Sequence, residues 1–303
     1  DGMYVGENRP GGAMMPVWRK PSGAEKKNME TARSKKSKKK MEETKEEKAD
    51  KKTSTPKDGR AKFYVMDNAG DTIRTFSSKL DTGMNRVYWP MNRDGVAYPS
   101  TRDRRPDADP PSGGSVLPGT YMVAVNFGDY NATTSVNVKA DPRLPFTMAQ
   151  MRAKATANKN YEAIVAKATA GYNQLKEVRK TMKRVATATE TLDKEAQKDF
   201  KEKMKAVNKE LDRLDALYFR PTGDRSSSTL SRTLRRGRGA IGSSDGAPNQ
   251  AAQRAMAKVE RETKFVLEQI NAFMEGDFAD FQKEVEALDF SLFKTYEPVK
   301  FDR

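Results

Sequence analysis

The chain has 303 residues and a mass of 33.9 kDa, and its 57 lysines and arginines outnumber 42 aspartates and glutamates to give a formal charge of +15. Cysteine and histidine are both absent, which excludes disulfides, thiolate nucleophiles, cysteine metal sites and the usual histidine general base. No apolar run approaches the roughly 18 residues that a membrane-spanning helix requires, and the length predicts about two domains. Because the first residue is Asp1 and not methionine, we expect a fragment or a processed product.

The first 60 residues divide into a short apolar part and a long charged part. Two apolar pieces, at 3–5 and 13–18, flank a Pro-Gly turn, and strands this short need a partner. We interpret residues 1–24 as residual strands of an upstream propeller module. Residues 25–60 have almost nothing to bury, which predicts a charged mobile insert. Its basic block contains Lys35, Lys36, Lys38, Lys39 and Lys40.

Residues 61–142 show the period of two that is typical of strands. Turn residues at 67–70 and 128–129 separate the strands of two expected hairpins, and the long segment 91–117 is expected to run over one end. This pattern predicts an immunoglobulin-like antiparallel β-sandwich. The alternating apolar residues are Phe63, Val65, Ile73, Phe76, Val87, Trp89, Tyr121, Val123, Val125, Phe127, Val136 and Val138.

From residue 143 the apolar spacing changes to three or four residues, which is typical of amphipathic helices. Thr147 and Gln150 form a capping box at the expected start of the first helix. A break near 187–191 separates it from a second helix that ends before Pro221, and Pro248 suits the first turn of a third. We therefore predict an α+β chain in which an antiparallel three-helix bundle occupies 143–303, with a flexible loop at 222–247 and a tail at 289–303.

The order of these parts resembles one known family. The motifs that carry the resemblance are Tyr4-Val5-Gly6-Glu7-Asn8-Arg9-Pro10, Gly83-Met84-Asn85-Arg86-Val87-Tyr88-Trp89, Pro118-Gly119-Thr120-Tyr121 and Asp141-Pro142-Arg143. Together they resemble the C-terminal part of exported bacterial β-propeller proteins with BNR/sortilin-like repeats, often labelled glycosyl hydrolases and found among Bacteroidetes. The chain differs from that family at Arg9, where the family has proline, and at Pro90, where it has aspartate.

The resemblance covers most of the chain outside 25–57 and 222–246, and no Asp-box propeller repeat occurs in it. It implies an exported protein in the periplasm, at the outer-membrane surface or outside the cell. It also implies that a propeller precedes Asp1 or lies on another chain. The tripeptide Asp71-Thr72-Ile73 is similar to the O-glycosylation signal of exported Bacteroidetes proteins.

Basic motifs provide candidates for anion binding. Residues 237–242 match the G-x-G-x-x-G pattern, but no apolar strand leads into them, which favours a flexible basic loop over a dinucleotide site. Arg232, Arg235, Arg236 and Arg238 have the charge to contact phosphates, although 222–246 lacks the aromatic residues that stack on bases. The lysine block at 35–40 has three interpretations: a solvated run, an anionic surface contact, or a nucleic-acid arm.

Acidic and aromatic residues provide the remaining candidates. Asp67 and Asp71 flank a turn, so turn formation explains them better than the facing pair of carboxylates that a glycosidase needs. Residues Asp103, Asp107 and Asp109 offer oxygen ligands for Ca²⁺ but lack the spacing of an EF-hand. For Trp89 and Tyr121 we favour a place in the core over stacking on sugars.

These observations predict no catalytic, cofactor-binding or metal-ligating residue in this chain. The leading hypothesis is a non-catalytic structural and interaction region that packs against a propeller or partner proteins. One alternative is the scaffold part of a propeller glycoside hydrolase whose active site lies upstream. Another is a basic module that binds nucleic acid or an anionic surface, of which nucleic acid is the less favoured.

Overall fold

A computed structural model describes residues 10–21, 58–189, 194–220, 228–243 and 246–287. The chain is of mixed α+β class, with antiparallel sheets followed by helices. It divides into two compact units, Asp1–Val96 with Arg105–Ala155, and Ala97–Arg104 with Thr156–Arg303. We call them the β unit and the helical unit. None of the described helices is long and apolar enough to cross a bilayer.

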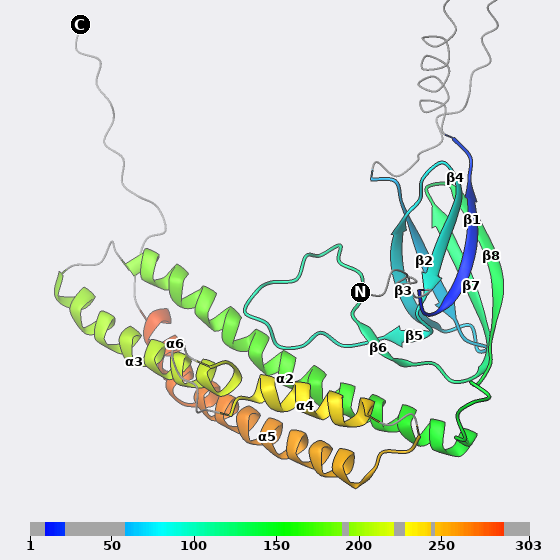
Figure 1. The fold of residues 1–303 in the computed structure, drawn as a ribbon. Helices are drawn as coiled ribbons and strands as arrows, with labels where there is room; N and C mark the ends of the chain where they lie inside the picture. Colours follow the sequence, from blue (N-terminus) through cyan, green and yellow to red (C-terminus); the bar gives the residue numbers. More distant parts are fainter. Residues whose placement is uncertain (1–9, 22–57, 190–193, 221–227, 244–245, 288–303) are drawn as a thin grey trace, which may run out of the picture. The chain divides into compact units, whose positions relative to one another are not determined.

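The β unit contains three antiparallel sheets (Figure 1). One pairs β1 with β4, another has the order β3-β2-β7-β8, and a third pairs β5 with β6. The strands are β1 (Ala13–Arg19), β2 (Arg60–Met66), β3 (Thr72–Lys79), β4 (Gly83–Trp89), β5 (Asn92–Asp94), β6 (Ser112–Ser115), β7 (Gly119–Phe127) and β8 (Tyr130–Val138).

Both hairpins predicted from the sequence are confirmed. Strands β2 and β3 pair with Phe63 opposite Phe76, and β7 and β8 pair with Phe127 opposite Tyr130. The first turn depends on Gly70, whose φ of +87° is disfavoured for residues with a Cβ. The Asp67 carboxylate stabilises the same turn by accepting the N–H group of Ala69 at 3.0 Å.

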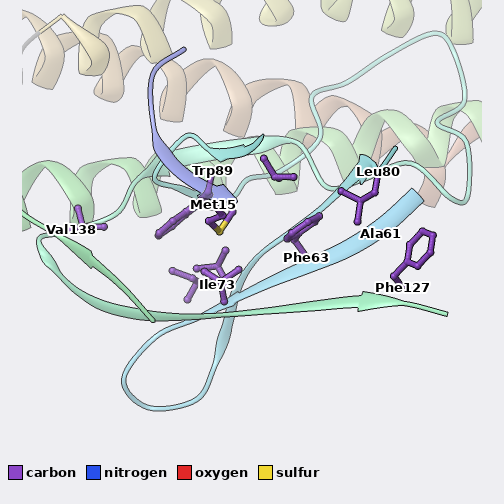
Figure 2. Close-up of a cluster of buried hydrophobic side chains, with 11 residues drawn as sticks. Met15, Ala61, Phe63, Ile73, Leu80, Trp89, Phe127 and Val138 are labelled. Atoms are coloured by element: carbon purple, nitrogen blue, oxygen red, sulfur yellow. The ribbon is translucent and has the colours of Figure 1, made fainter. Parts of the chain in front are cut away.

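The β1–β4 sheet and the four-stranded sheet contribute to one hydrophobic core (Figure 2). Trp89 lies at its centre with no exposed surface, which confirms its predicted core position. Its indole N–H donates to the carbonyl of Asn92 at 3.0 Å. Its ring packs edge-on against the ring of Tyr121, with the two ring centroids 5.4 Å apart. Tyr121 is partly buried against the cluster. The buried residues are Met15, Ala61, Phe63, Val65, Ile73, Leu80, Val87, Trp89, Val123, Phe127 and Val138.

Strand β1 corrects the interpretation of residues 1–24 as part of an upstream module. It pairs along its whole length with β4, with Met15 opposite Val87, and Met15 belongs to the core of the β unit. The partner that the short apolar piece needs is therefore in this chain. Residues 1–9 lie outside the described residues, as do 22–57, which include the lysine block and most of the predicted insert.

The free edge of β3 is covered by carboxylates from the segment that joins β4 to β7. Asp94 accepts the N–H group of Thr75 at 3.0 Å, and Asp109 accepts the N–H group of Ser77 at 2.8 Å. Arg74 donates to Asp94 at 2.8 Å and neutralises it. Because an unpaired strand edge invites pairing with another chain, these contacts protect β3 from strand addition.

Helix α2 begins directly after Thr147, the first residue of the predicted capping box. The N–H group of Thr147 donates to the side chain of Gln150 at 2.9 Å, and the N–H group of Gln150 donates to the Thr147 hydroxyl at 3.3 Å. Asn249 caps α5, so Pro248 precedes the helix instead of lying in its first turn. The helices are α2 (Met148–Ala188), α3 (Lys194–Tyr218), α4 (Leu230–Gly242), α5 (Gln250–Glu275) and α6 (Asp277–Glu286).

Helices α2 and α3 pack antiparallel. Tyr172 contacts Tyr218 with ring centroids 4.9 Å apart, and Arg179 of α2 forms ion pairs with Asp212 and Asp215 of α3. The predicted third apolar stripe is divided between α5 and α6, because the chain turns at Gly276. The predicted tail at 289–303 lies outside the described residues.

Helix α4 shows that the prediction of a flexible loop at 222–247 is wrong for its central part. Residues Leu230–Gly242 form a helix that lies side by side with α5 (Figure 1). Leu234 and Ile241 are buried. Gly237 allows the close approach, because an added Cβ would be 2.6 Å from Cγ2 of Val259 on α5. Residues 221–227 and 244–245 lie outside the described part of the chain.

Segment 97–104 follows β5 in the sequence but belongs to the helical unit. The Thr169 hydroxyl of α2 donates to the carbonyl of Ala97 at 2.7 Å. Lys176, about two helical turns further on, donates to the carbonyl of Ser100 and forms an ion pair with Asp103. The expectation that all of 91–117 runs over one end of the sandwich is therefore wrong for these residues.

Candidate functional site

A polar hollow of about 380 Å³ lies between segment 97–104 and α2 within the helical unit. Its lining contains two acidic residues, Asp103 and Glu177, which makes it a candidate catalytic site. Lys176 and Lys180 both form ion pairs with Asp103, and Lys180 also pairs with Glu177 at 2.9 Å. The hydrogen bond from Lys176 lowers the pKa of Asp103.

This arrangement does not fit a glycosidase. A glycosidase general acid needs a raised pKa, so that it holds a proton near neutral pH, and the second carboxylate must face it across the substrate. Here the pKa of Asp103 is lowered, and lysines occupy the space around both acids. The contacts instead hold segment 97–104 against α2.

A chain of tyrosine hydroxyls secures the same segment. Tyr161 of α2 donates to the carbonyl of Leu234 on α4 at 2.6 Å, and its oxygen lies 2.8 Å from the hydroxyl of Tyr98. Because the Tyr161 proton is already donated, Tyr98 must donate to Tyr161. Burial raises the pKa of Tyr161 and Tyr218, and it raises the pKa of Tyr172 to about 12.

We expect the helical unit to lose stability in alkali. The folded-state pKa of Tyr172 lies above the ordinary value of 10.0, so its contribution is fully present below pH 10.0 and is lost as the pH rises toward about 12. Circular dichroism of the helices should fall together with the appearance of tyrosinate absorbance. The Tyr172→Phe variant should lose less helicity over this range, which separates tyrosine from lysine titration. Tyrosinate absorbance that is complete before any helicity is lost would contradict the prediction.

The predicted acidic candidates do not converge. Asp67 stabilises the β2–β3 turn, and Asp71 is exposed beside it. Asp103 contacts lysines of the helical unit, whereas Asp109 contacts Ser77 of the β unit and Asp107 is exposed. Within the described ranges, no group of three or more acidic side chains is placed to hold a metal ion.

The G-x-G-x-x-G pattern at 237–242 lies inside α4, so it forms no phosphate-binding loop between a strand and a helix. The arginines around it are therefore carried by an ordered helix. Arg232, Arg235, Arg236 and Arg238 are all exposed.

The most unusual surface in the β unit is the outer side of the β1–β4 sheet, which we call the apolar face. Trp18 and Met84 lie opposite each other and are 64% and 65% exposed, and Met14, opposite Tyr88, is 52% exposed. Pro16 and Arg86 form the pair between them. Soluble proteins rarely expose large apolar side chains as a contiguous group unless the group contacts something.

The composition of the apolar face is that of a protein interface. Tryptophan, tyrosine, methionine and arginine are enriched at interface centres and dominate their binding energy. Arg86 is exposed, and it makes no hydrogen bond or ion pair with any described residue. A matching surface would therefore be apolar, with a carboxylate opposite Arg86.

The sequence contained a signal for the apolar face that the predictions above did not use. Both alternating sets of β1 are apolar, with Met15 and Val17 on one side and Met14 and Trp18 on the other. A strand that is half exposed normally alternates apolar with polar residues, whereas a strand covered on both sides does not. The pattern of residues 13–19 thus predicts that both sides of β1 become covered.

Comparisons with protein-family models, with curated proteins and with solved structures found no match for this chain.

Proposed function

We propose that this chain is a non-catalytic structural and interaction region of an exported β-propeller protein, and that it packs against the propeller or a partner protein. The observation that carries the proposal is the apolar face, where Trp18, Met84 and Met14 are exposed around Arg86. The acids of the hollow beside Asp103, by contrast, are paired with lysines. The apolar face is therefore the described surface whose composition best suits the binding of a partner.

Details of the β unit support an immunoglobulin-like sandwich as its finer architecture. The Tyr121 hydroxyl donates to the carbonyl of Leu117 at 2.7 Å, four residues earlier. This contact is similar to the tyrosine corner of immunoglobulin-like domains, and the buried Trp89 beside Tyr121 is similar to their core tryptophan. Such domains commonly serve as binding and spacing modules, which agrees with the proposed role.

Contacts among the helices support the antiparallel three-helix bundle as the finer architecture of the second unit. Helix α3 packs on α2 near Tyr172, and α4 contacts α2 at Tyr161. We propose that α3 and α4 stand in the place of the second helix of this bundle, and α5 and α6 in the place of the third. Lys203 of α3 pairs with Glu284 of α6 at 2.9 Å.

The occupant that best fits the apolar face is another folded module with a carboxylate inside an apolar surface. A second copy of this chain fits poorly, because a two-fold contact centred on this face would bring Arg86 against its own copy. A propeller blade or a partner protein avoids that repulsion. The resemblance of residues 83–89 and 118–121 to the propeller family favours the propeller.

Site-specific cross-linking tests this assignment in cells that produce the whole protein. A photoreactive amino acid at position 18 should cross-link to the propeller or to one partner protein. Tyr130 is a matched control, because it is also aromatic, 59% exposed and part of the β unit. Equal yields at positions 18 and 130, or cross-links at neither, would contradict an interface at the apolar face.

The scaffold of a glycoside hydrolase is the second candidate, and the same resemblance supports it. Reading the encoded sequence upstream of Asp1 distinguishes the two, because a propeller hydrolase requires Asp-box repeats and facing acidic residues there. Turnover of aryl glycosides by the purified chain at enzyme-like rates would overturn the non-catalytic role itself.

The two tryptophans provide a direct measurement of the apolar face. Trp18 is 64% exposed and Trp89 is fully buried, so we expect acrylamide to quench the emission of Trp18 alone. The Trp18→Phe variant should emit at shorter wavelength and resist quenching. If the unmodified chain resists quenching to the same degree as this variant, Trp18 is covered and the face is not free.

A further inference from the structure

Three arginines of helix α4 carry positive charge that no described residue neutralises. Arg232, Arg235 and Arg236 are exposed, and their spacing of three and four residues places them on one side of the helix. None of the three guanidinium groups forms a hydrogen bond or ion pair with another described residue. The helix contains no acidic residue of its own.

The neighbouring helices also contain ion pairs, which these three arginines lack. Arg179 of α2 pairs with two aspartates of α3, Lys258 of α5 pairs with Glu262, and Lys283 of α6 pairs with Asp280. In α4, like charges at a spacing of three or four residues repel one another. Arg232 also lies in the first turn, where the positive end of the helix dipole disfavours a cation. This arrangement lowers the stability of α4 unless an anion binds it.

The arginines are held in place, because the other side of α4 is firmly packed. Leu234 has no exposed surface, Ile241 is buried, and Gly237 contacts both Val259 of α5 and Tyr161 of α2. An ordered helix presents guanidinium groups without the entropy loss that a flexible loop would suffer on binding. Guanidinium groups bind phosphate oxygens with two parallel hydrogen bonds.

We propose that Arg232, Arg235 and Arg236 bind the phosphate groups of an anionic lipid surface. Helix α4 lies along α5 and does not project from it, so it suits a flat array of phosphates better than the groove of a duplex. It also lacks aromatic residues, which single-stranded nucleic acids use for stacking. The arginines belong to the helical unit and the apolar face belongs to the β unit, so this site adds a second contact to the proposed function.

The test uses the full chain and vesicles of phosphatidylcholine and phosphatidylglycerol in equal parts, with pure phosphatidylcholine vesicles as the neutral control. We expect the triple variant Arg232→Gln, Arg235→Gln and Arg236→Gln to bind the anionic vesicles about 100-fold more weakly than the parent. The matched control replaces Lys201, Lys205 and Lys209 of α3, which are exposed at a spacing of four residues, by glutamine. It removes the same charge and should lose less than about 5-fold. All three proteins keep the lysine block at 35–40, so the difference reports α4.

Two outcomes would overturn the proposal. Equal losses in the two triple variants would mean that net charge alone attracts the chain to the vesicles. Absence of parent binding to the anionic vesicles would remove the lipid site, and if the parent then binds a short duplex DNA in a manner that depends on the α4 arginines, the ligand is nucleic acid. Circular dichroism and resistance to chymotrypsin, whose cleavage sites the substitutions leave in place, should be unchanged in both variants, which shows that a loss of binding is not a loss of folding.

Discussion

Replacing Trp89 by alanine is expected to lower the free energy of unfolding of the β unit by about 3–5 kcal/mol, because it removes a large, fully buried ring and leaves a cavity. The ring also contacts Tyr121, and its N–H group donates to the carbonyl of Asn92. Its loss therefore affects both sheets and the start of β5. Urea denaturation followed by circular dichroism measures the change.

The matched control is Trp18→Ala. It removes the same side chain from a position that is 64% exposed, so its effect should stay within about 0.5 kcal/mol. A comparable loss in the two variants would mean that the two tryptophans do not differ in burial as described. A near-neutral Trp89→Ala would place the centre of the core elsewhere.

Replacing Leu234 by alanine is expected to lower the free energy of unfolding of the helical unit by about 2–5 kcal/mol. Leu234 has no exposed surface, and its carbonyl accepts the hydroxyl of Tyr161. The change should loosen α4 and make the peptide bonds that follow its arginines accessible to proteases. Limited trypsin digestion then gives early cleavage within residues 232–238 in the variant and late cleavage there in the parent.

Arg235→Ala is the control for Leu234→Ala, because Arg235 is exposed and has no partner among the described residues. Its effect on stability should stay within about 0.5 kcal/mol. Rapid cleavage of the parent within residues 232–238 would show that α4 is a loop, as the sequence had suggested.

The parts of the fold that could be predicted are those that depend on neighbours in sequence. The β2–β3 hairpin follows from alternation around a four-residue turn, and the start of α2 follows from Thr147 and Gln150. The place of β1 could not be predicted in this way. Its partner β4 follows it by more than 60 residues, across the charged segment 22–57, and only the core shows why Met15 belongs with Val87.

Helix α4 was missed because its buried side is unusually poor in large apolar residues. Its stripe is Leu230, Leu234, Gly237 and Ile241, which has helical spacing but a glycine where a large residue is expected. Glycine costs about 1 kcal/mol in a helix interior, so the sequence favours a loop there. The close approach to Val259 explains this glycine, and it became visible only when α5 was in place.

The candidate site was partly predictable. The charge of the α4 arginines makes them candidates for phosphate contact from the sequence alone, but their fixed presentation on one side of a helix could not be predicted. The apolar face required the pairing of β1 with β4, which brings Trp18 opposite Met84. Neither residue stands out by itself, since single exposed apolar residues are common.

The chain enters the helical unit twice, first at Ala97–Arg104 and again from Thr156. A gene fragment that starts at residue 143 would therefore encode helices without Tyr98 and without the carbonyl that Thr169 contacts. Recombination at a single breakpoint cannot transfer this helical module intact to another protein. The two modules are expected to have been inherited together, and changes in one should constrain which changes the other tolerates.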